Sequence, residues 1–89
     1  MTINYKVQFT KVALKYFEKL DRRIQKRVAK IVEALKNNPY VVPNIKPVEG
    51  IPYEQYRIRV GNLRIVFRVD NQKLLIVIVR IGPRGDIYK

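Results

Sequence analysis

The chain has 89 residues, which is enough for one domain (residues 1–89) and too few for two. Its hydrophobic content of 47% is that of a folded protein and argues against intrinsic disorder. Cysteine and histidine are both absent, which excludes disulfides and thiolate metal sites and removes the commonest general base and metal ligand. No cofactor is therefore expected.

Charge is the clearest global property of the sequence. Nineteen Lys and Arg residues stand against seven Asp and Glu, a formal net charge of +12, which attracts nucleic acid, an anionic membrane or an acidic protein. A generally charged thermophile-like surface would carry both signs in comparable number, so nucleic acid or an acidic partner is favoured. The longest apolar run, residues 74–79, is far too short to span a membrane, and residues 1–10 lack a signal-peptide pattern. We expect a cytoplasmic protein with no membrane partner.

The first half of the chain predicts one strand and two helices. Residues 3–9 alternate apolar and polar, as a half-buried strand does. Thr10 is placed to cap a short helix that ends near residue 20, and Asp21 to cap a longer one that ends at Asn37-Asn38-Pro39. The two helices should form an antiparallel hairpin. The expected buried positions are Ala13, Leu14, Phe17 and Leu20 in the first helix, and Ile24, Val28, Ile31, Val32 and Leu35 in the second.

The second half predicts a loop followed by a meander. Residues 39–53 contain four prolines and a glycine, which is typical of an extended loop. Strands are expected over residues 54–60, 63–69 and 73–80, with tight turns at Gly61-Asn62 and Asp70-Asn71 and a loop from residue 82 onward. The order β-α-α-β-β-β predicts an α+β fold in which the helical hairpin covers one face of an antiparallel sheet.

Alternation in the first two meander strands separates two faces. If Gly61-Asn62 is a two-residue turn, Val60 pairs with Leu63 and Arg59 with Arg64. One face is then apolar and should pack on the helices, with Tyr56, Ile58, Val60, Leu63, Ile65, Phe67, Leu74, Ile76 and Ile78. The other face holds Arg57, Arg59, Arg64, Val66 and Arg68, beside Leu75, Val77 and Val79.

Opposed arginines are not what folding alone would select. Like charges directly across a strand pair cost a few tenths to about 1 kcal/mol, and no acidic residue shares this face in the expected register. One interpretation is that arginines keep an open sheet face soluble while their aliphatic stems cover the valines. The alternative, which we favour, is a phosphate site, because the guanidinium fork binds two oxygens at once.

The hairpin and the C-terminal residues also carry a resemblance to a known family. The run GIPYEQYRIRVGNLRIVFRV (residues 50–69), followed by VRIGPRGDIY (residues 79–88), resembles the RelE/ParE toxin superfamily of type II toxin–antitoxin systems, in particular its RelE branch. The resemblance extends over nearly the whole chain. It implies a toxin that cleaves mRNA in the ribosomal A site, and a cognate antitoxin that wraps around it with acidic or amphipathic helical segments. It further implies that operator DNA is bound only by the toxin–antitoxin complex.

The resemblance also suggests which residues act. The family's functional basic pair matches Arg57 and Arg59, and a loop lysine matches Lys46; with Arg68 at the periphery, these would bind RNA phosphate. The catalytic positions match Arg64, Arg84 and Tyr88. Arg64 and Arg84 suit stabilisation of the charge that develops on the phosphorane. Tyr88 would stack on a base or carry a proton.

The catalytic base is left unassigned by the sequence. Many relatives have lysine at positions 57 and 59, and arginine does not release a proton in a protein. Some have a histidine where this chain has Pro83. Tyr88, Lys46 and Glu54 are the remaining candidates. Two other functions stay open on the same fold: a ParE-like DNA gyrase poison, and a catalytically weak nucleic-acid-binding relative that acts with an antitoxin as an operon repressor.

Overall fold

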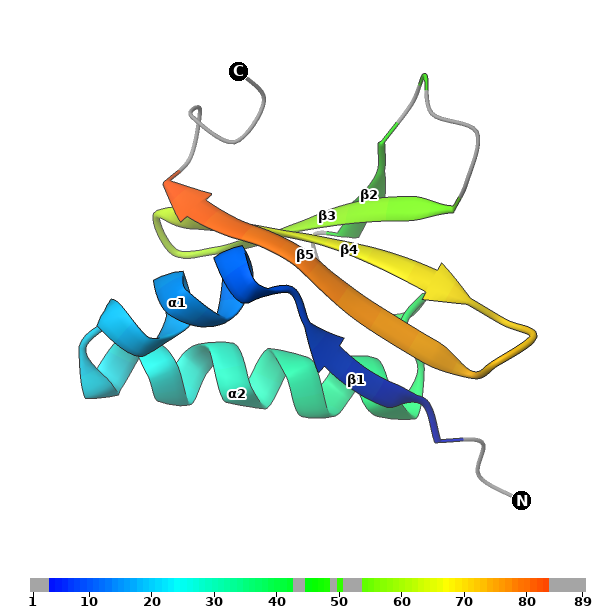
Figure 1. Ribbon diagram of the computed structural model, residues 1–89, viewed down its shortest axis with the longest axis horizontal. Helices are drawn as coiled ribbons and strands as arrows, with labels where there is room; N and C mark the ends of the chain where they lie inside the picture. Colours follow the sequence, from blue (N-terminus) through cyan, green and yellow to red (C-terminus); the bar gives the residue numbers. More distant parts are fainter. Residues whose placement is uncertain (1–3, 43–44, 49, 51–53, 84–89) are drawn as a thin grey trace.

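The computed structural model describes residues 4–42, 45–48, 50 and 54–83, and shows two helices packed on one face of a sheet (Figure 1). In these residues the order is β1 (Lys6–Phe9), α1 (Lys11–Lys19), α2 (Arg22–Asn37), β2 (Ile45–Pro47), β3 (Gln55–Val60), β4 (Leu63–Asp70) and β5 (Leu75–Pro83). The sheet order is β1-β5-β4-β3-β2, with β1 parallel to β5 and the other pairs antiparallel. The predicted α+β class is confirmed. Neither of these helices is long and apolar enough to cross a membrane.

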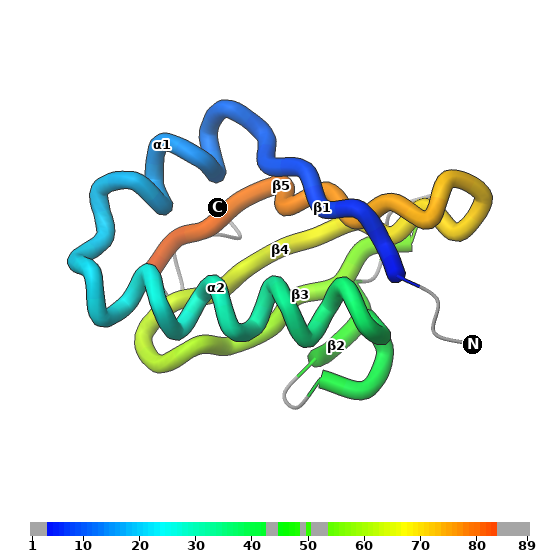
Figure 2. The backbone as a smooth tube through the Cα atoms, turned by 90° about the horizontal axis from the view of Figure 1, so that it is seen from below, coloured from blue at the N-terminus to red at the C-terminus, as the bar shows by residue number. Residues whose placement is uncertain are grey.

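Both helices begin at the predicted caps. The Thr10 hydroxyl accepts a hydrogen bond from the Ala13 amide at 3.1 Å, and the Asp21 carboxylate accepts one from the Ile24 amide at 2.9 Å. After α1 the chain turns, and α2 runs back along the same face of the sheet, below it in Figure 1 and in front of it in Figure 2. The predicted stripe is wrong at Leu14, which is 44% exposed. Leu14 lies about 100° around the helix from the buried Ala13, and Tyr16 packs against the core instead.

The core lies between the two helices and the sheet, with Ala13 of α1 in the same cluster as α2 and the β3–β4–β5 meander. Val28 and Leu35 of α2 are fully buried, as predicted. They belong to the same cluster as the apolar face of the strands: Ile58, Val60, Leu63, Ile65, Phe67, Val69, Ile76, Ile78 and Ile81. The β3–β4 register is the predicted one, with Val60 opposite Leu63 and Arg59 opposite Arg64. The turn between them has Gly61 at a φ of +60°, a left-handed conformation that glycine adopts without strain.

The proline-rich segment was predicted as a loop throughout, and this prediction was wrong for residues 45–47. They form β2, which pairs with β3 so that Lys46 lies opposite Arg57 and Pro47 opposite Tyr56. Proline is tolerated here because β2 is an edge strand, whose outer side needs no backbone donor. The edge strand brings Lys46 next to the arginines of β3.

The β4–β5 turn is longer than predicted. Asp70 pairs with Leu75, so four residues and not two connect the strands. The Asp70 carboxylate accepts hydrogen bonds from the amides of Gln72 and Lys73, each at 3.1 Å. Aspartate favours turns because its side chain can accept such bonds from the backbone that follows it. Leu74 has a φ of 51° and is 39% exposed, so it lies outside the core in which it was expected.

A β-bulge interrupts the pairing of β4 with β5. Phe67 pairs with Ile78 but Val66 pairs with Arg80, which leaves Val79 as the extra residue. The Val79 carbonyl accepts a hydrogen bond of 2.7 Å from the Thr10 hydroxyl, and the Thr10 amide donates to the Ile78 carbonyl at 3.0 Å. The residue that caps α1 therefore also holds the bulge. Beyond it, β5 continues to Pro83, past the predicted end at Arg80.

Tyrosine side chains tie together several segments beside the β4–β5 turn. Glu54 accepts hydrogen bonds of 2.7 Å from the hydroxyls of Tyr40 and Tyr56. Asn71 donates to Glu54 and to the Tyr40 oxygen, and accepts from Tyr5 at 2.6 Å. Burial, with the hydrogen bond to Glu54 acting in the same direction, raises the pKa of Tyr40 and of Tyr56 to about 12. Both phenols therefore ionise only well above the usual tyrosine pKa of about 10.

The Thr10 hydroxyl both caps α1 and holds the bulge, so its removal should destabilise the fold more than the loss of a helix cap alone. Thr10→Ala should lower the free energy of unfolding by about 2 kcal/mol, because it removes the cap and leaves the part-buried Val79 carbonyl without that donor. Asp21→Ala, which removes a cap alone, should cost about 1 kcal/mol. Urea unfolding of both variants measures the difference. Thr10→Ser keeps the hydroxyl and is the control; equal stability of the Ala and Ser variants would contradict the role of the hydroxyl.

The tyrosine cluster predicts a late-titrating component in the absorbance of tyrosine. In the folded protein, part of the phenolate signal should appear only near pH 12, whereas in urea it should appear near pH 10. Because the folded-state pKa is the higher one, the stability that depends on these groups is complete below pH 10 and is lost as the pH rises toward 12. Glu54→Gln should move the late component to lower pH, since a phenolate then forms without a neighbouring carboxylate. An unchanged titration curve in that variant would contradict the assignment.

Candidate nucleic-acid interface

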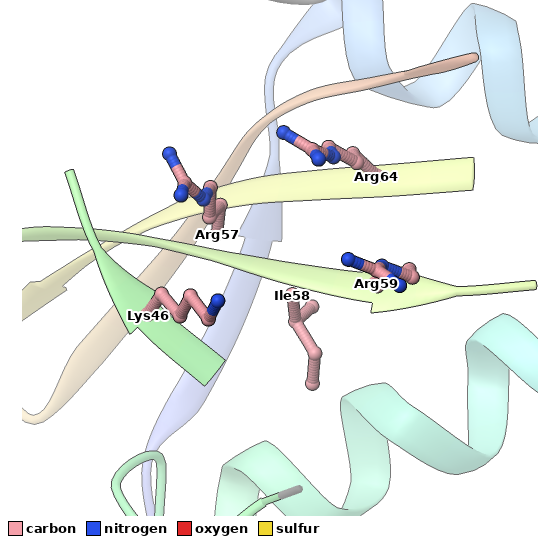
Figure 3. A pocket seen from close by; sticks show the side chains of 5 residues that line it. All are labelled: Lys46, Arg57, Ile58, Arg59 and Arg64. Carbon is pink, nitrogen blue, oxygen red and sulfur yellow. The ribbon is translucent and has the colours of Figure 1, made fainter. Parts of the chain in front are cut away.

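The sheet surface opposite the helices carries a row of arginines, here called the arginine face: Arg57 and Arg59 of β3 with Arg64 and Arg68 of β4. Strand alternation produces it, because Ile58, Ile65 and Phe67 point into the core. In Figure 3, Ile58 points toward α2 while Arg57 and Arg64 lie on the other side of the strands. The predicted separation of the hairpin into two faces is confirmed by the observed register.

Three of these arginines and Lys46 surround a pocket. It has a volume of about 110 Å³ and is lined by Lys46, Arg57, Arg59 and Arg64, with Ile58 beneath them (Figure 3). Lys46 enters from β2, which is why a strand in the proline-rich segment matters for the site. Arg57 and Arg64 are half-buried, whereas Lys46 and Arg59 are exposed. The pocket is therefore open to solvent on one side and bounded by cations.

The other expected site residues lie elsewhere or outside the described residues. Arg68 is four residues from Arg64 along β4, about 13 Å away, and lines a second cavity of about 430 Å³ beside the β4–β5 turn. It shares the arginine face but not the pocket. Arg84 and Tyr88 fall outside the residues that the structure describes. Of the seven residues expected in the site, four thus converge on one pocket.

The electrostatics of the pocket favour a polyanionic ligand. Arg59 and Arg64 are directly opposed across β3 and β4, an arrangement that costs up to about 1 kcal/mol in the absence of a ligand. A bound phosphate would offset that repulsion, because it places negative charge between guanidinium groups that can each donate two hydrogen bonds.

The pocket lining limits which proton transfers are possible there. Arginine does not deprotonate in proteins, so among the described residues that line the pocket Lys46 is the only one able to exchange a proton. Glu54, one of the candidate bases, does not line this pocket; its carboxylate binds Tyr40, Tyr56 and Asn71 near the second cavity. Among the described residues, no group of three or more metal-ligating side chains is placed to hold a metal ion.

One basic residue of this surface was missed in the sequence. Strict alternation would have placed Arg80 on the same side as Ile78, but the bulge at Val79 puts it opposite Val66, on the side of the arginine face. Bulges have no reliable sequence signature. The signal in the sequence was the spacing of two isoleucines, Ile78 and Ile81, which are three residues apart. Strict alternation would place them on opposite faces of the sheet, whereas the structure buries both.

Comparison with known proteins identifies the family of this chain. The family described as the ParE toxin of the type II toxin–antitoxin system parDE matches residues 7–88. A RelE-like toxin protein of Escherichia coli is 34% identical over 89 residues, covering 97% of this chain and 92% of the relative. The toxin–antitoxin complex RelBE2 of Mycobacterium tuberculosis contains a chain 28% identical, with a TM-score of 0.78 and coverage of 97% and 98%.

The fold agrees equally well with an archaeal structure. The RelE–RelB complex of Pyrococcus horikoshii OT3 contains a chain with a TM-score of 0.83 at 24% identity, covering 93% of this chain and 98% of that one. At that identity the likeness concerns the fold alone. The family match over most of the chain and the identity to a RelE-like toxin go further and confirm the predicted resemblance. The chain belongs to the RelE/ParE superfamily and is a toxin of the type II toxin–antitoxin class.

Proposed function

We propose that this toxin is a ribosome-dependent mRNA endoribonuclease that inhibits translation. The observation that carries the proposal is the pocket in which Lys46, Arg57, Arg59 and Arg64 converge. A concave, cationic site on a rigid sheet suits a phosphodiester held for reaction, because the chemistry consists largely of positioning and of charge stabilisation. The similarity to a RelE-like toxin supports the same activity.

The reaction proposed is attack by the RNA on itself. A ribose 2′-OH loses its proton, its oxygen forms a bond to the adjacent phosphorus, and the bond from phosphorus to the 5′-oxygen breaks as that oxygen gains a proton. The products are a 2′,3′-cyclic phosphate and a 5′-hydroxyl end. Negative charge accumulates on the non-bridging oxygens in the transition state, so cations fixed beside them lower the barrier.

The residues take three roles in this proposal: phosphate binding, charge stabilisation, and base stacking or proton transfer. Arg57, Arg59 and Lys46 hold the phosphodiester, and Lys46 is also the lining group able to donate a proton to the leaving oxygen. Arg64, together with Arg84, stabilises the developing charge. Tyr88 contributes either a stacking surface for a base or a proton-transfer group. Arg68 binds the RNA backbone farther along the face.

The proposal includes an antitoxin partner. Two similar solved structures are RelE–RelB and RelBE2 toxin–antitoxin complexes. A toxin with a net charge of +12 is suited to a partner whose helical segments are acidic or amphipathic. In this arrangement operator DNA is bound by the toxin–antitoxin complex and not by the toxin alone.

A second candidate function is inhibition of DNA gyrase, because the matching family is described as the ParE toxin. Two assays on the purified protein separate the candidates: mapping of mRNA cuts on programmed ribosomes by primer extension, and supercoiling by gyrase. Cuts at the A-site codon with unaffected supercoiling are expected. Inhibited supercoiling without cuts would instead establish the gyrase function, and RNA binding without either effect would identify a binding relative that has lost catalysis.

Arg64 provides the first test of the site. Arg64→Ala should lower the rate of mRNA cleavage by about a hundredfold or more, the usual effect of removing one group that stabilises a transition-state anion, while thermal unfolding stays close to that of the wild type. Arg84→Ala should behave in the same way. Lys30→Ala removes the same charge from the exposed surface of α2 and is the control. Cleavage at the control's rate would remove the tested arginine from the active site.

Tyr88 is tested with a pair of substitutions. Tyr88→Ala should reduce cleavage by about tenfold or more, whether the side chain stacks or transfers a proton. Tyr88→Phe keeps the ring and removes the hydroxyl, so retained cleavage identifies stacking, and a loss equal to that of the alanine variant identifies proton transfer. The measurement is single-turnover cleavage on ribosomes. A Tyr88→Ala variant as active as the wild type would exclude both roles.

A further inference from the structure

Arg80 lies beside the pocket without belonging to its lining. The bulge at Val79 makes Arg80 the partner of Val66, and Val66 is in turn the partner of Arg57. Residues directly opposite one another in an antiparallel pair project to the same side of the sheet. Ile81, the next residue, is buried in the core, so Arg80 projects the other way, and it is exposed.

The register thus aligns a row of four residues at one level across four strands, and three of them are cations. The row consists of Lys46 on β2, Arg57 on β3, Val66 on β4 and Arg80 on β5. With adjacent strands about 4.8 Å apart, the backbones of Arg57 and Arg80 are separated by about 10 Å, and those of Lys46 and Arg80 by about 14 Å. In the neighbouring row, Arg59 and Arg64 are followed on β5 by Gly82, which contributes no side chain.

The row is therefore longer than the pocket. Lys46 and Arg57 line the pocket, whereas Arg80 extends the positive surface beyond it in the direction perpendicular to the strands. A single phosphate in the pocket has Arg57, Arg59 and Arg64 around it already. A polyanion that continues across the sheet would meet Arg80 next.

We propose that Arg80 binds the phosphate that follows the one held in the pocket, so that RNA lies across the strands with at least two consecutive phosphates in contact with the sheet. The inference rests on the proposed function in that it takes RNA as the ligand. Arg80 is a binding residue in this assignment and takes no part in bond breaking. Thr10 supports it indirectly, since its hydroxyl holds the bulged Val79 carbonyl at 2.7 Å.

A structural role for Arg80 must be separated from a binding role. Val66 is only 6% exposed, and the aliphatic stem of Arg80 is one of the groups next to it in the register. Arg80→Met keeps an unbranched apolar stem and removes the charge. Lys30→Met removes one charge from α2, on the far side of the sheet, and is the matched control for the overall fall in net charge.

The experiment measures binding of a short single-stranded RNA by fluorescence anisotropy over a range of salt concentrations. Each phosphate contact contributes about 0.7 to the slope of log affinity against log salt for a single strand. Arg80→Met should lower that slope by about 0.7 and weaken binding about threefold to tenfold at moderate salt, with unchanged thermal stability. Lys30→Met should leave the slope as in the wild type.

A second measurement tests the position of the contact. On programmed ribosomes, one uncharged methylphosphonate linkage is placed next to the cleaved linkage, on its 5′ or its 3′ side. On one of the two sides, the methylphosphonate should slow cleavage by the wild type. It should not slow cleavage by Arg80→Met any further, because the phosphate and the arginine form one contact.

The outcomes distinguish this inference from the proposed function. Equal salt slopes for Arg80→Met and Lys30→Met would overturn the assignment of Arg80, even if the wild type cuts mRNA. Binding that depends on Arg80 without any cleavage would support the assignment while contradicting the endoribonuclease function. Absence of RNA binding by a wild type that still cuts mRNA on ribosomes would overturn the assignment of Arg80 and leave the endoribonuclease function standing.

Discussion

The register of the β3–β4 hairpin is the constraint on which the rest of the structure depends. Side chains alternate across a strand with a period of two, so a slip of one residue would bury Arg57, Arg59 and Arg64 and expose the isoleucines. The two-residue turn at Gly61 prevents this slip. A side chain at position 61 would be strained at a φ of +60°, and its Cβ would lie 3.3 Å from Nη1 of Arg27 on α2. The same turn therefore fixes the core and the spacing of the cations in the pocket.

The site is completed by irregular features at both sides of this hairpin. On one side, the short edge strand β2 places Lys46 opposite Arg57. On the other side, the bulge in β5 turns Arg80 toward the same surface, and the residue that caps α1 holds the bulge in place. The arrangement gathers like charges at a cost of up to about 1 kcal/mol for each opposed pair. A fold selected for stability alone would place opposite charges on these strands, so the gathering of like charges supports the proposed anionic ligand.

The sequence predicted the regular parts of this molecule and failed at the exceptions to periodicity. Both helix caps, the hairpin register and the composition of the arginine face follow from local rules: side-chain oxygens that cap amides, a glycine turn and strand alternation. Strand β2 was missed because proline argues against a strand unless it lies at an edge, and edge position is decided by tertiary structure. Arg80 was missed because a bulge changes the parity of every residue after it. Both exceptions concern a basic residue at the pocket: Lys46 was expected in the site but not on a strand, and Arg80 was not expected on this surface.

The two ends of the sheet have opposite chemical character. At one end, beside the β4–β5 turn, Glu54 gathers the hydroxyls of Tyr40 and Tyr56, and both phenols stay protonated because burial and the carboxylate raise their pKa. That end joins β1, the segment after α2 and the meander by hydrogen bonds. At the other end, the described residues that line the pocket are cations above Ile58, and none of these residues is a carboxylate. The Glu54 carboxylate thus holds segments together away from the pocket, and among the described residues that line the pocket Lys46 is the one that can exchange a proton. Because arginine can bind a phosphate but not accept a proton, the four-cation pocket is better suited to gripping the phosphodiester than to activating the 2′-OH.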